Sequence, residues 1–443
     1  MKWFAGALVV LLIGAFWRLG YVLYAMYALL GLIVLGRFLT QRWVGGLEVE
    51  RQCDRSEAQI GDRVEVNVIV RNRGRLSVPW VLLEEAIPQS AVMEMPPRLK
   101  RTGHWTAVTK LKRGDEEAFS YELECRMRGC YPIGPMMIET GDLFGLHRRF
   151  RTSGEPHILT VFPTVVPLLG WDLSTRKPLG KMRLAHRLFE DPIQISGIRD
   201  YQPGDAMNRI HWRATARTGQ LQSKTYDPSC VTGAAILLDF HVESLSGEGQ
   251  VARTELAVVA AASLANAVLQ GGQPAGLFTN GRDGLERMRR EGWVGDYRTR
   301  SEAAKHTQSS ELDDRLRPLI IEPRRSGEQM PRILELLARL EPSDGLSFSG
   351  LIGEIEGRLP RNANIVAVVQ QLDEDSMLLL AGFHRRGFSV TVVQVAFSPR
   401  GATPDWALMS ETVIRLVAAG VTVRRITDEA TLAEACAADW SMG

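Results

Sequence analysis

The segment from Ile198 to Arg217 is denser in Arg, Asp, His and aromatic residues than the sequence on either side of it. Asp200, Asp205 and His211 are of types that act as general acids and bases, so one pair with an orienting group would suit proton transfer. The same residues also fit a structural role, in which Asp205 caps a helix and arginine–carboxylate pairs clamp a loop onto a core. The residues leave catalysis open and favour the structural interpretation.

Three arginines of this segment, Arg209, Arg213 and Arg217, are spaced by four, so a single helix would carry them on one face. With Trp212 they would offer phosphate contacts and a stacking surface for nucleic acid. Acidic neighbours and the balance of the whole chain, 53 Lys and Arg against 51 Asp and Glu, argue against that use. We therefore expect no nucleic-acid partner.

Length and composition exclude several classes of protein. A chain of 443 residues exceeds the roughly 250–300 residues at which single cores stop growing, so we expect two or three domains. The 45% hydrophobic and 23% charged residues are ordinary for a folded protein and exclude wholesale disorder. Five scattered cysteines make a disulfide framework an unfavourable interpretation, and the sequence contains no CxxC, HExxH or P-loop motif.

The N-terminal region carries the sharpest local bias. Residues 3–17 and 19–36 contain no charged side chain, and as helices they would be about 22 and 27 Å long. A hydrocarbon core is about 30 Å thick, and basic residues before the first run and after the second favour cytoplasmic ends. We therefore predict a transmembrane helical hairpin in residues 1–43 of a multi-pass cell-membrane protein, with the bulk of the chain cytoplasmic. A single anchor, either one long span or a signal-like segment, is the alternative.

Two hydrophobicity patterns follow, and each predicts a domain. In residues 44–167 apolar and polar residues alternate, as in Val64 to Val70, which is typical of short strands in an antiparallel β-sandwich. In residues 234–443 short apolar strands alternate with helices, which predicts a doubly wound parallel α/β fold. Residues 168–233 form a linker that carries the signature segment. A charged stretch at about 282–330 is expected to be an excursion outside the sheet.

The α/β domain is predicted in enough detail to be checked element by element. The expected strands are Ala235–Phe240, Ala275–Thr279, Ile365–Val369, Ser389–Val395 and Val421–Ile426. The expected helices are Thr254–Leu269, Met377–Arg386 and Glu411–Ala419, with a short further helix near Ser301–Lys305.

The signature segment resembles that of the domain-of-unknown-function 58 family, membrane-anchored proteins of bacteria and archaea. The matching residues are Arg199, Tyr201, Gly204, Asp205, Arg209, Ile210, His211 and Trp212. Further motifs upstream are similar to that family's: Arg128-Gly129-Cys130-Tyr131, Gly141 to Leu146, and Val161-Phe162-Pro163. The resemblance implies a β-sandwich followed by a von Willebrand factor A-like domain. It also implies two partners that are often encoded beside members of this family, a MoxR-type AAA+ ATPase and a transglutaminase-like membrane protein.

The resemblance raises the question of a metal site. Domains of the von Willebrand factor A type can hold Mg²⁺ through Asp-x-Ser-x-Ser at the end of the first strand, because oxygen ligands suit that ion. Here Asp239 keeps the first position, but His241 and Glu243 replace both serines. Asp239, Glu243 and Asp373 form a degenerate candidate set, and we expect a metal-free sheet and no cofactor.

These features predict a membrane-tethered, non-enzymatic scaffold or adaptor. It would present the α/β domain to a cytoplasmic partner, for which the resemblance implies the MoxR-type AAA+ ATPase. The alternative is a membrane-anchored hydrolase or other enzyme that uses Asp205 and His211. The residues assigned to interaction or structure are Arg199, Tyr201, Gly204, Asp205, Arg209, His211, Trp212, Arg213 and Arg217.

Overall fold

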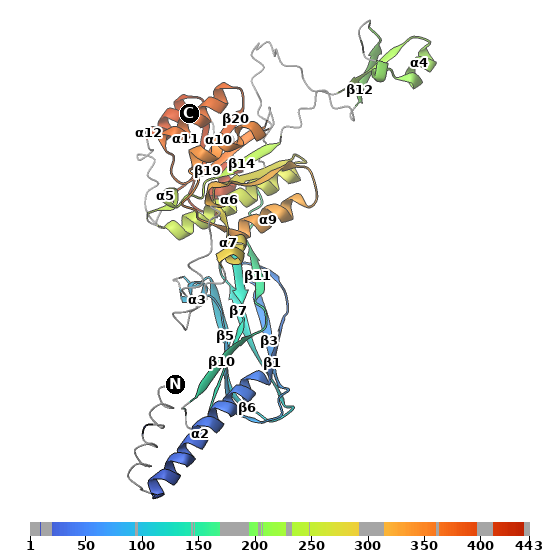
Figure 1. Ribbon diagram of the computed structural model, residues 1–443. Helices are drawn as coiled ribbons and strands as arrows, with labels where there is room; N and C mark the ends of the chain where they lie inside the picture. The colour runs from blue at the N-terminus through green and yellow to red at the C-terminus, as the bar shows by residue number, and fades with distance from the viewer. Residues whose placement is uncertain are drawn as a thin grey trace. The chain divides into compact units, whose positions relative to one another are not determined.

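The computed structural model divides into two compact units, each described by itself below (Figure 1). The first comprises residues 1–164, 283–312 and 335–340, and the second comprises residues 165–282, 313–334 and 341–443. The structure describes residues 9, 20–93, 96–142, 145, 147–168, 195–202, 205, 207–226, 233–247, 249–291, 314–359, 363–396 and 411–437.

Helix α2, Gly20–Gly45, is the long apolar element of the first unit, and it continues past the predicted end of the span at Gly36. Its N-terminal half is largely exposed, as the 95% and 75% exposed fractions of Tyr21 and Tyr24 show. Among the described helices, α2 from Tyr24 and α6, Gln250–Gln270, are long and apolar enough to cross a membrane, but α6 is mostly buried in the second unit. Apart from Val9, the predicted span 3–17 lies outside the described residues.

The C-terminal half of α2 packs against the first unit's sheets. Gly36, Thr40, Trp43 and Val44 are buried, and their spacing of three and four residues places them on one helix face. The helix contacts β9 and β10. Gly36 lies so close to Asp142 that a Cβ at position 36 would be 2.9 Å from the Asp142 Oδ2. The apolar helix is therefore continuous with the folded unit rather than loosely joined to it.

Two antiparallel sheets make up most of the first unit, with strand orders β1-β3-β7-β5 and β10-β9-β4-β6, beside a smaller sheet β2-β11-β8. The elements are β1 (Leu47–Cys53), β2 (Glu57–Gln59), β3 (Arg63–Asn72), β4 (Val78–Glu85), α3 (Gln89–Met93), β5 (Leu99–Gly103), β6 (Thr106–Leu111), β7 (Glu116–Cys125), β8 (Gly129–Ile133), β9 (Met136–Gly141), β10 (Arg148–Ser153) and β11 (His157–Phe162).

One hydrophobic core lies between the two larger sheets. Val64, Val66 and Val68 of β3 are fully buried in it, together with Met136 and Ile138 of β9 from the other sheet. The alternation of buried and exposed residues along β3 places its valines on one face, as the sequence predicted. The layering is that of a sandwich.

A six-stranded sheet of order β17-β15-β14-β19-β20-β21 organises the second unit; β17 is antiparallel and the other five strands are parallel. Its strands are β14 (Ala234–Leu238), β15 (Ala275–Thr279), β17 (Leu319–Arg324), β19 (Asn364–Val369), β20 (Ser389–Val395) and β21 (Thr422–Ile426). The helices that follow β14 along the chain are α5 (Val242–Leu245), α6, α7 (Gly284–Glu291), η2 (Asp314–Leu316), α9 (Gln329–Arg339), α10 (Phe348–Ile355), η3 (Glu356–Arg358), α11 (Glu374–Arg385), α12 (Glu411–Ala418) and α13 (Glu429–Ala437). Of these, α7 and the C-terminal end of α9 belong to the first unit. The two-residue strands β16 (Arg282–Asp283) and β18 (Leu340–Glu341) pair with each other.

Helices cover both faces of the six-stranded sheet (Figure 1). Ala235 and Leu237 of β14 share a core with residues of α10, α11 and α12. Ile236 and Leu238 are fully buried and alternate with them onto the other face, where α6 contacts β14, β15, β19 and β20. All five strands predicted for this sheet are present at nearly the predicted positions, and α6, α11 and α12 match the predicted helices.

The sequence predicted that the charged stretch 282–330 lies outside the sheet, and this prediction is wrong for one part of it. Its residues Leu319–Arg324 form the antiparallel edge strand β17. The apolar run is short and includes Pro323, a residue that argues against a strand unless the strand is at an edge, where the missing donor costs no ladder bond. The helix expected near Ser301–Lys305 falls outside the described residues.

Candidate functional site

The signature segment forms a small hairpin within the predicted linker 168–233. Strands β12 (Ile195–Asp200) and β13 (Gln222–Tyr226) pair in antiparallel fashion, and the chain between them contains η1 (Met207–Arg209) and α4 (Trp212–Thr218). We call residues 195–226 the signature hairpin. Gly204 lies outside the described residues.

An ion pair holds the turn after β12. The Arg199 Nη2 lies 2.7 Å from the Asp205 Oδ1, and the Gln202 N–H donates to the Asp205 Oδ2 at 3.1 Å. These two contacts, the Gln202 N–H first and Arg199 second, hold the pKa of the Asp205 carboxyl below its usual value. The Tyr201 hydroxyl donates to the Asp205 backbone carbonyl at 3.4 Å. Arg199, Tyr201 and Asp205 are therefore brought together, in a structural arrangement.

His211, not Asp205, is the N-cap of α4. The imidazole Nδ1 of His211 accepts a hydrogen bond from the backbone N–H of Ala214 at 3.0 Å. The backbone N–H of His211 donates to the Gln222 carbonyl at 2.8 Å. The Asp200 Oδ1 accepts from the Gln222 Nε2 at 2.7 Å. Within the described part of the hairpin, no hydrogen bond or ion pair joins His211 to either aspartate. The acid–base set of the enzyme hypothesis is not assembled here.

The prediction that one helix carries three arginines is wrong for Arg209. Arg209 ends η1, and only Arg213 and Arg217 lie in α4, because the chain leaves helical geometry at Ile210 to form a bridge with Ser223. Arg213 and Arg217 are exposed, and no described carboxylate lies within ion-pair distance of either. Trp212 is 66% exposed. The described part of the hairpin thus presents an exposed indole and two guanidinium groups that pair with no described carboxylate.

A second cluster lies where the strand order of the parallel sheet reverses, between β14 and β19. Ligands of open α/β sheets bind at the carboxyl ends of strands at such a point. Asp239 follows β14 and is 1% exposed; its Oδ1 accepts the Asn280 Nδ2 at 2.9 Å and the His241 N–H at 3.2 Å. Burial raises the pKa of this carboxyl above its usual value.

Asn280 links three segments at this edge. Besides its bond to Asp239, its Oδ1 accepts the Phe240 N–H at 2.7 Å and its Nδ2 donates to the Leu346 carbonyl at 3.1 Å. The side-chain amide of Gln370, which follows β19, is buried with no hydrogen-bond partner in the structure. Sequence reasoning missed Asn280, although a polar residue directly after a predicted strand was the available signal.

The degenerate carboxylate set is not brought together as metal ligands. Asp239 is buried, whereas Glu243 and Asp373 are exposed, the latter at the N-cap of α11. Across the described ranges, no group of three His, Cys, Asp or Glu residues is placed to hold a metal ion.

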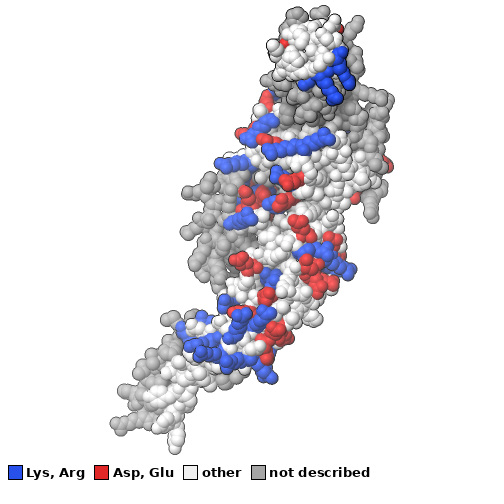
Figure 2. Space-filling view, turned by 90° about the vertical axis from the view of Figure 1, so that its right-hand side faces the viewer, with Lys and Arg blue, Asp and Glu red and all other residues white. Residues whose placement is uncertain are grey.

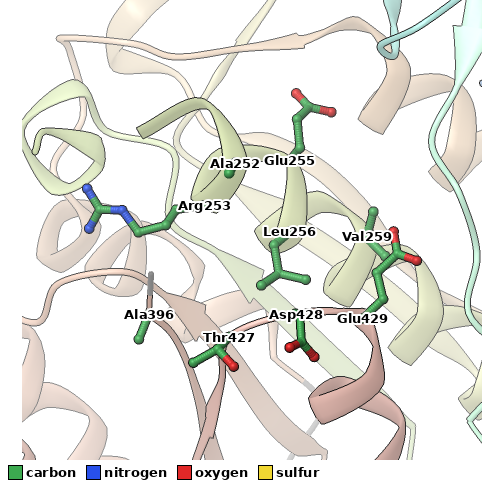
Figure 3. Close-up of a pocket in the computed structure, with 9 residues that line it drawn as sticks. All are labelled: Ala252, Arg253, Glu255, Leu256, Val259, Ala396, Thr427, Asp428 and Glu429. Carbon is green, nitrogen blue, oxygen red and sulfur yellow. The ribbon is translucent and has the colours of Figure 1, made fainter. Parts of the chain in front are cut away.

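A cavity of about 280 Å³ lies near the carboxyl ends of β20 and β21, lined in part by α6 (Figure 3). Its polar groups serve local structure. The Asp428 Oδ1 accepts the Thr431 N–H at 2.7 Å, and the Arg253 Nη2 donates to the Ser246 carbonyl at 2.7 Å. In Figure 3 the Arg253 guanidinium is directed away from Asp428. None of the predicted site residues lines this cavity.

Comparison with known proteins supports the family resemblance over part of the chain. Residues 197–291 match the family described as "Protein of unknown function DUF58". The uncharacterized protein YeaD of Bacillus subtilis (strain 168) is 24% identical over 267 residues, which cover 59% of this chain and 62% of that protein. The match therefore spans less than two thirds of this relative's length.

Similar solved structures include the CARDB domain of the PF1109 protein from Pyrococcus furiosus, with 15% identity over 26% of this chain and 91% of that one, at a TM-score of 0.19. Another is the C-terminal domain of wzt, with 13% identity over 27% of this chain and 75% of that one, at a TM-score of 0.19.

Proposed function

We propose that the protein is a membrane-tethered scaffold or adaptor without enzymatic activity, which binds a partner through its second unit. One observation carries this proposal: α4 presents the exposed Trp212 and also carries the exposed Arg213 and Arg217, in a hairpin whose described acidic groups already make structural contacts. Tryptophan and arginine supply much of the binding energy at protein interfaces, because they bury a large surface and still make polar contacts.

We assign the six-stranded sheet and its helices to the von Willebrand factor A-like class. The five parallel strands, helices on both faces and Asp239 at the end of a central strand support this assignment. Such a domain offers its carboxyl edge and neighbouring loops as a surface, which suits a scaffold. The enzyme alternative has weaker support, because His211 caps α4 and Asp205 pairs with Arg199.

We infer that α2 is the membrane anchor and forms a transmembrane hairpin with residues 3–17. The exposed apolar surface of α2 supports this, as does its packing against the first unit from Gly36 onward. Basic residues at both ends of the hairpin orient the bulk of the chain to the cytoplasm. The partner proposed from the family resemblance is a MoxR-type AAA+ ATPase, with a transglutaminase-like membrane protein in the same assembly.

Binding of the purified full chain to a MoxR-type ATPase tests the scaffold proposal. Trp212→Ala removes the exposed indole and is expected to weaken binding about 30-fold, the effect of losing a residue worth at least about 2 kcal/mol. The matched control is Leu378→Ala, which truncates a 48% exposed side chain on α11 and should leave binding unchanged. Equal affinities of wild type and Trp212→Ala would contradict the proposal.

A further inference from the structure

Strand β10 is a basic edge strand. It is the outermost strand of the sheet β10-β9-β4-β6, so one side of its backbone has no neighbouring strand in that sheet. The run Arg148-Arg149-Phe150-Arg151 is exposed throughout, and Phe150 keeps 48% of its surface accessible. Three arginines and an aromatic ring on an open edge form a surface that attracts anions and also carries an apolar group.

Most of this charge is not neutralised by the residues that the structure describes. The Arg148 Nη1 lies 3.7 Å from Glu139, but its side chain is 68% exposed. No described carboxylate lies within ion-pair distance of Arg149 or Arg151. These two residues alternate with Phe150 along the strand and therefore share a face of the sheet. Because this edge carries an excess of positive charge, it favours a negatively charged partner.

The basic edge lies beside the apolar helix, within the same unit. α2 contacts both β9 and β10, and its Gly36 touches Asp142 in the turn that joins those strands. Arg37 and Arg42 are exposed on the same stretch of α2. Figure 2 shows Lys and Arg side chains gathered at the end of the first unit next to an uncharged surface. A helix that enters a bilayer would therefore bring β10 to the headgroup level.

We propose that β10, together with Arg37 and Arg42, binds the anionic phospholipid headgroups of the leaflet that α2 enters. This inference rests on the proposed membrane anchor. A guanidinium group can donate two parallel hydrogen bonds to two oxygens of one phosphate. An aromatic ring such as that of Phe150 is favourably placed at the boundary between headgroups and acyl chains. Each basic residue at an anionic leaflet contributes about a fivefold gain in binding. The surface would hold the first unit against the bilayer in one orientation.

Hydrogen exchange of the full chain in lipid nanodiscs tests the inference. Nanodiscs of phosphatidylcholine alone are compared with nanodiscs that also contain phosphatidylglycerol. Amides of residues 148–153 should exchange at least about fivefold more slowly in the anionic nanodiscs. The double variant Arg149→Gln with Arg151→Gln should lose this lipid-dependent protection. The matched control, Arg63→Gln with Lys100→Gln, changes two exposed basic residues on the other sheet and should keep it.

Two further measurements separate the outcomes. If the wild type is released from native membranes by alkaline extraction, both the anchor and this inference fail. If it is retained, but residues 148–153 exchange equally in both lipids or the double variant keeps its protection, only this inference is overturned. Inorganic phosphate added to phosphatidylcholine nanodiscs should give no protection; the same protection with phosphate alone would identify an anion site and contradict a bilayer surface.

Discussion

Tyr131 lies over the backbone of Gly129, and its hydroxyl donates to the carbonyls of Met127 at 2.9 Å and Arg128 at 3.0 Å. The ring occupies the space that a side chain at position 129 would need. The pairing of glycine and tyrosine in the Arg-Gly-Cys-Tyr motif is thus explained by a local fold at the start of β8. The Arg199–Asp205 ion pair likewise holds the backbone of a turn in the signature hairpin. At both places, side chains of types that could take part in catalysis instead hold the local backbone conformation.

Gly129→Ala is expected to destabilise the first unit by about 1–3 kcal/mol, because the new Cβ would be overpacked against the tyrosine ring. An ideal Cβ there would stand 2.7 Å from the Tyr131 Cζ, a position that requires the ring to move. Denaturant unfolding of the full chain, followed by hydrogen exchange of β8, measures the effect. The control is Gly114→Ser, at another positive-φ glycine with open space around it. Equal losses in both variants would point to backbone strain and refute overpacking against Tyr131.

At the scale of elements, a buried ion pair joins the two large sheets. Arg51 of β1 contacts Glu85 of β4, and the two side chains are 8% and 0% exposed. Burial raises the pKa of Glu85, and the neighbouring Arg51 opposes that rise. The pair is costly to desolvate, and it is costlier still to break, since an unpaired charge would remain in the core.

Arg51→Met is therefore expected to destabilise the first unit by about 3–5 kcal/mol at neutral pH, and the double variant Arg51→Met with Glu85→Leu to recover most of the loss. The loss should shrink as pH falls. A raised folded-state pKa gives stability that is present below the unfolded pKa of about 4.3 and is lost as pH rises through the folded pKa. Urea unfolding over a pH series measures both effects. A double variant no more stable than Arg51→Met would contradict the desolvation argument.

The elements differ in how well the sequence predicts them. β14, β15, β19 and β20 were predictable because buried parallel strands are continuous apolar runs between helices. β17 was not, because an edge strand within charged sequence shows no such run. In the candidate sites, Arg199 and Asp205 were predictable as neighbours in sequence. The contact of Asp239 with Asn280 depends on which strands the topology places side by side, and no local pattern encodes that.

For the whole molecule, the decisive question is how the apolar helix is joined to the folded chain. A flexible tether would let the units orient freely, whereas α2 is packed on β9 and β10 through Gly36 and carries Trp43 into the core. Under the proposed function, this packing fixes the orientation of the first unit relative to the membrane that α2 enters. The motif residue Asp142 takes part: its Oδ1 accepts the His147 N–H at 3.2 Å, which closes the turn that Gly36 touches.

Gly36→Leu tests this coupling, and the same helix supplies its control. A Cβ at Gly36 would stand 2.9 Å from the Asp142 Oδ2, whereas one at Gly31 would meet nothing within 4 Å. Gly36→Leu should therefore speed hydrogen exchange in β9 and β10 of the full chain, by a destabilisation of about 1–3 kcal/mol, while Gly31→Leu should not. Both variants should resist alkaline extraction from membranes equally, since leucine keeps the helix apolar. Unchanged exchange in Gly36→Leu would mean that the helix is only a tether, and the first unit would then have no fixed orientation to present.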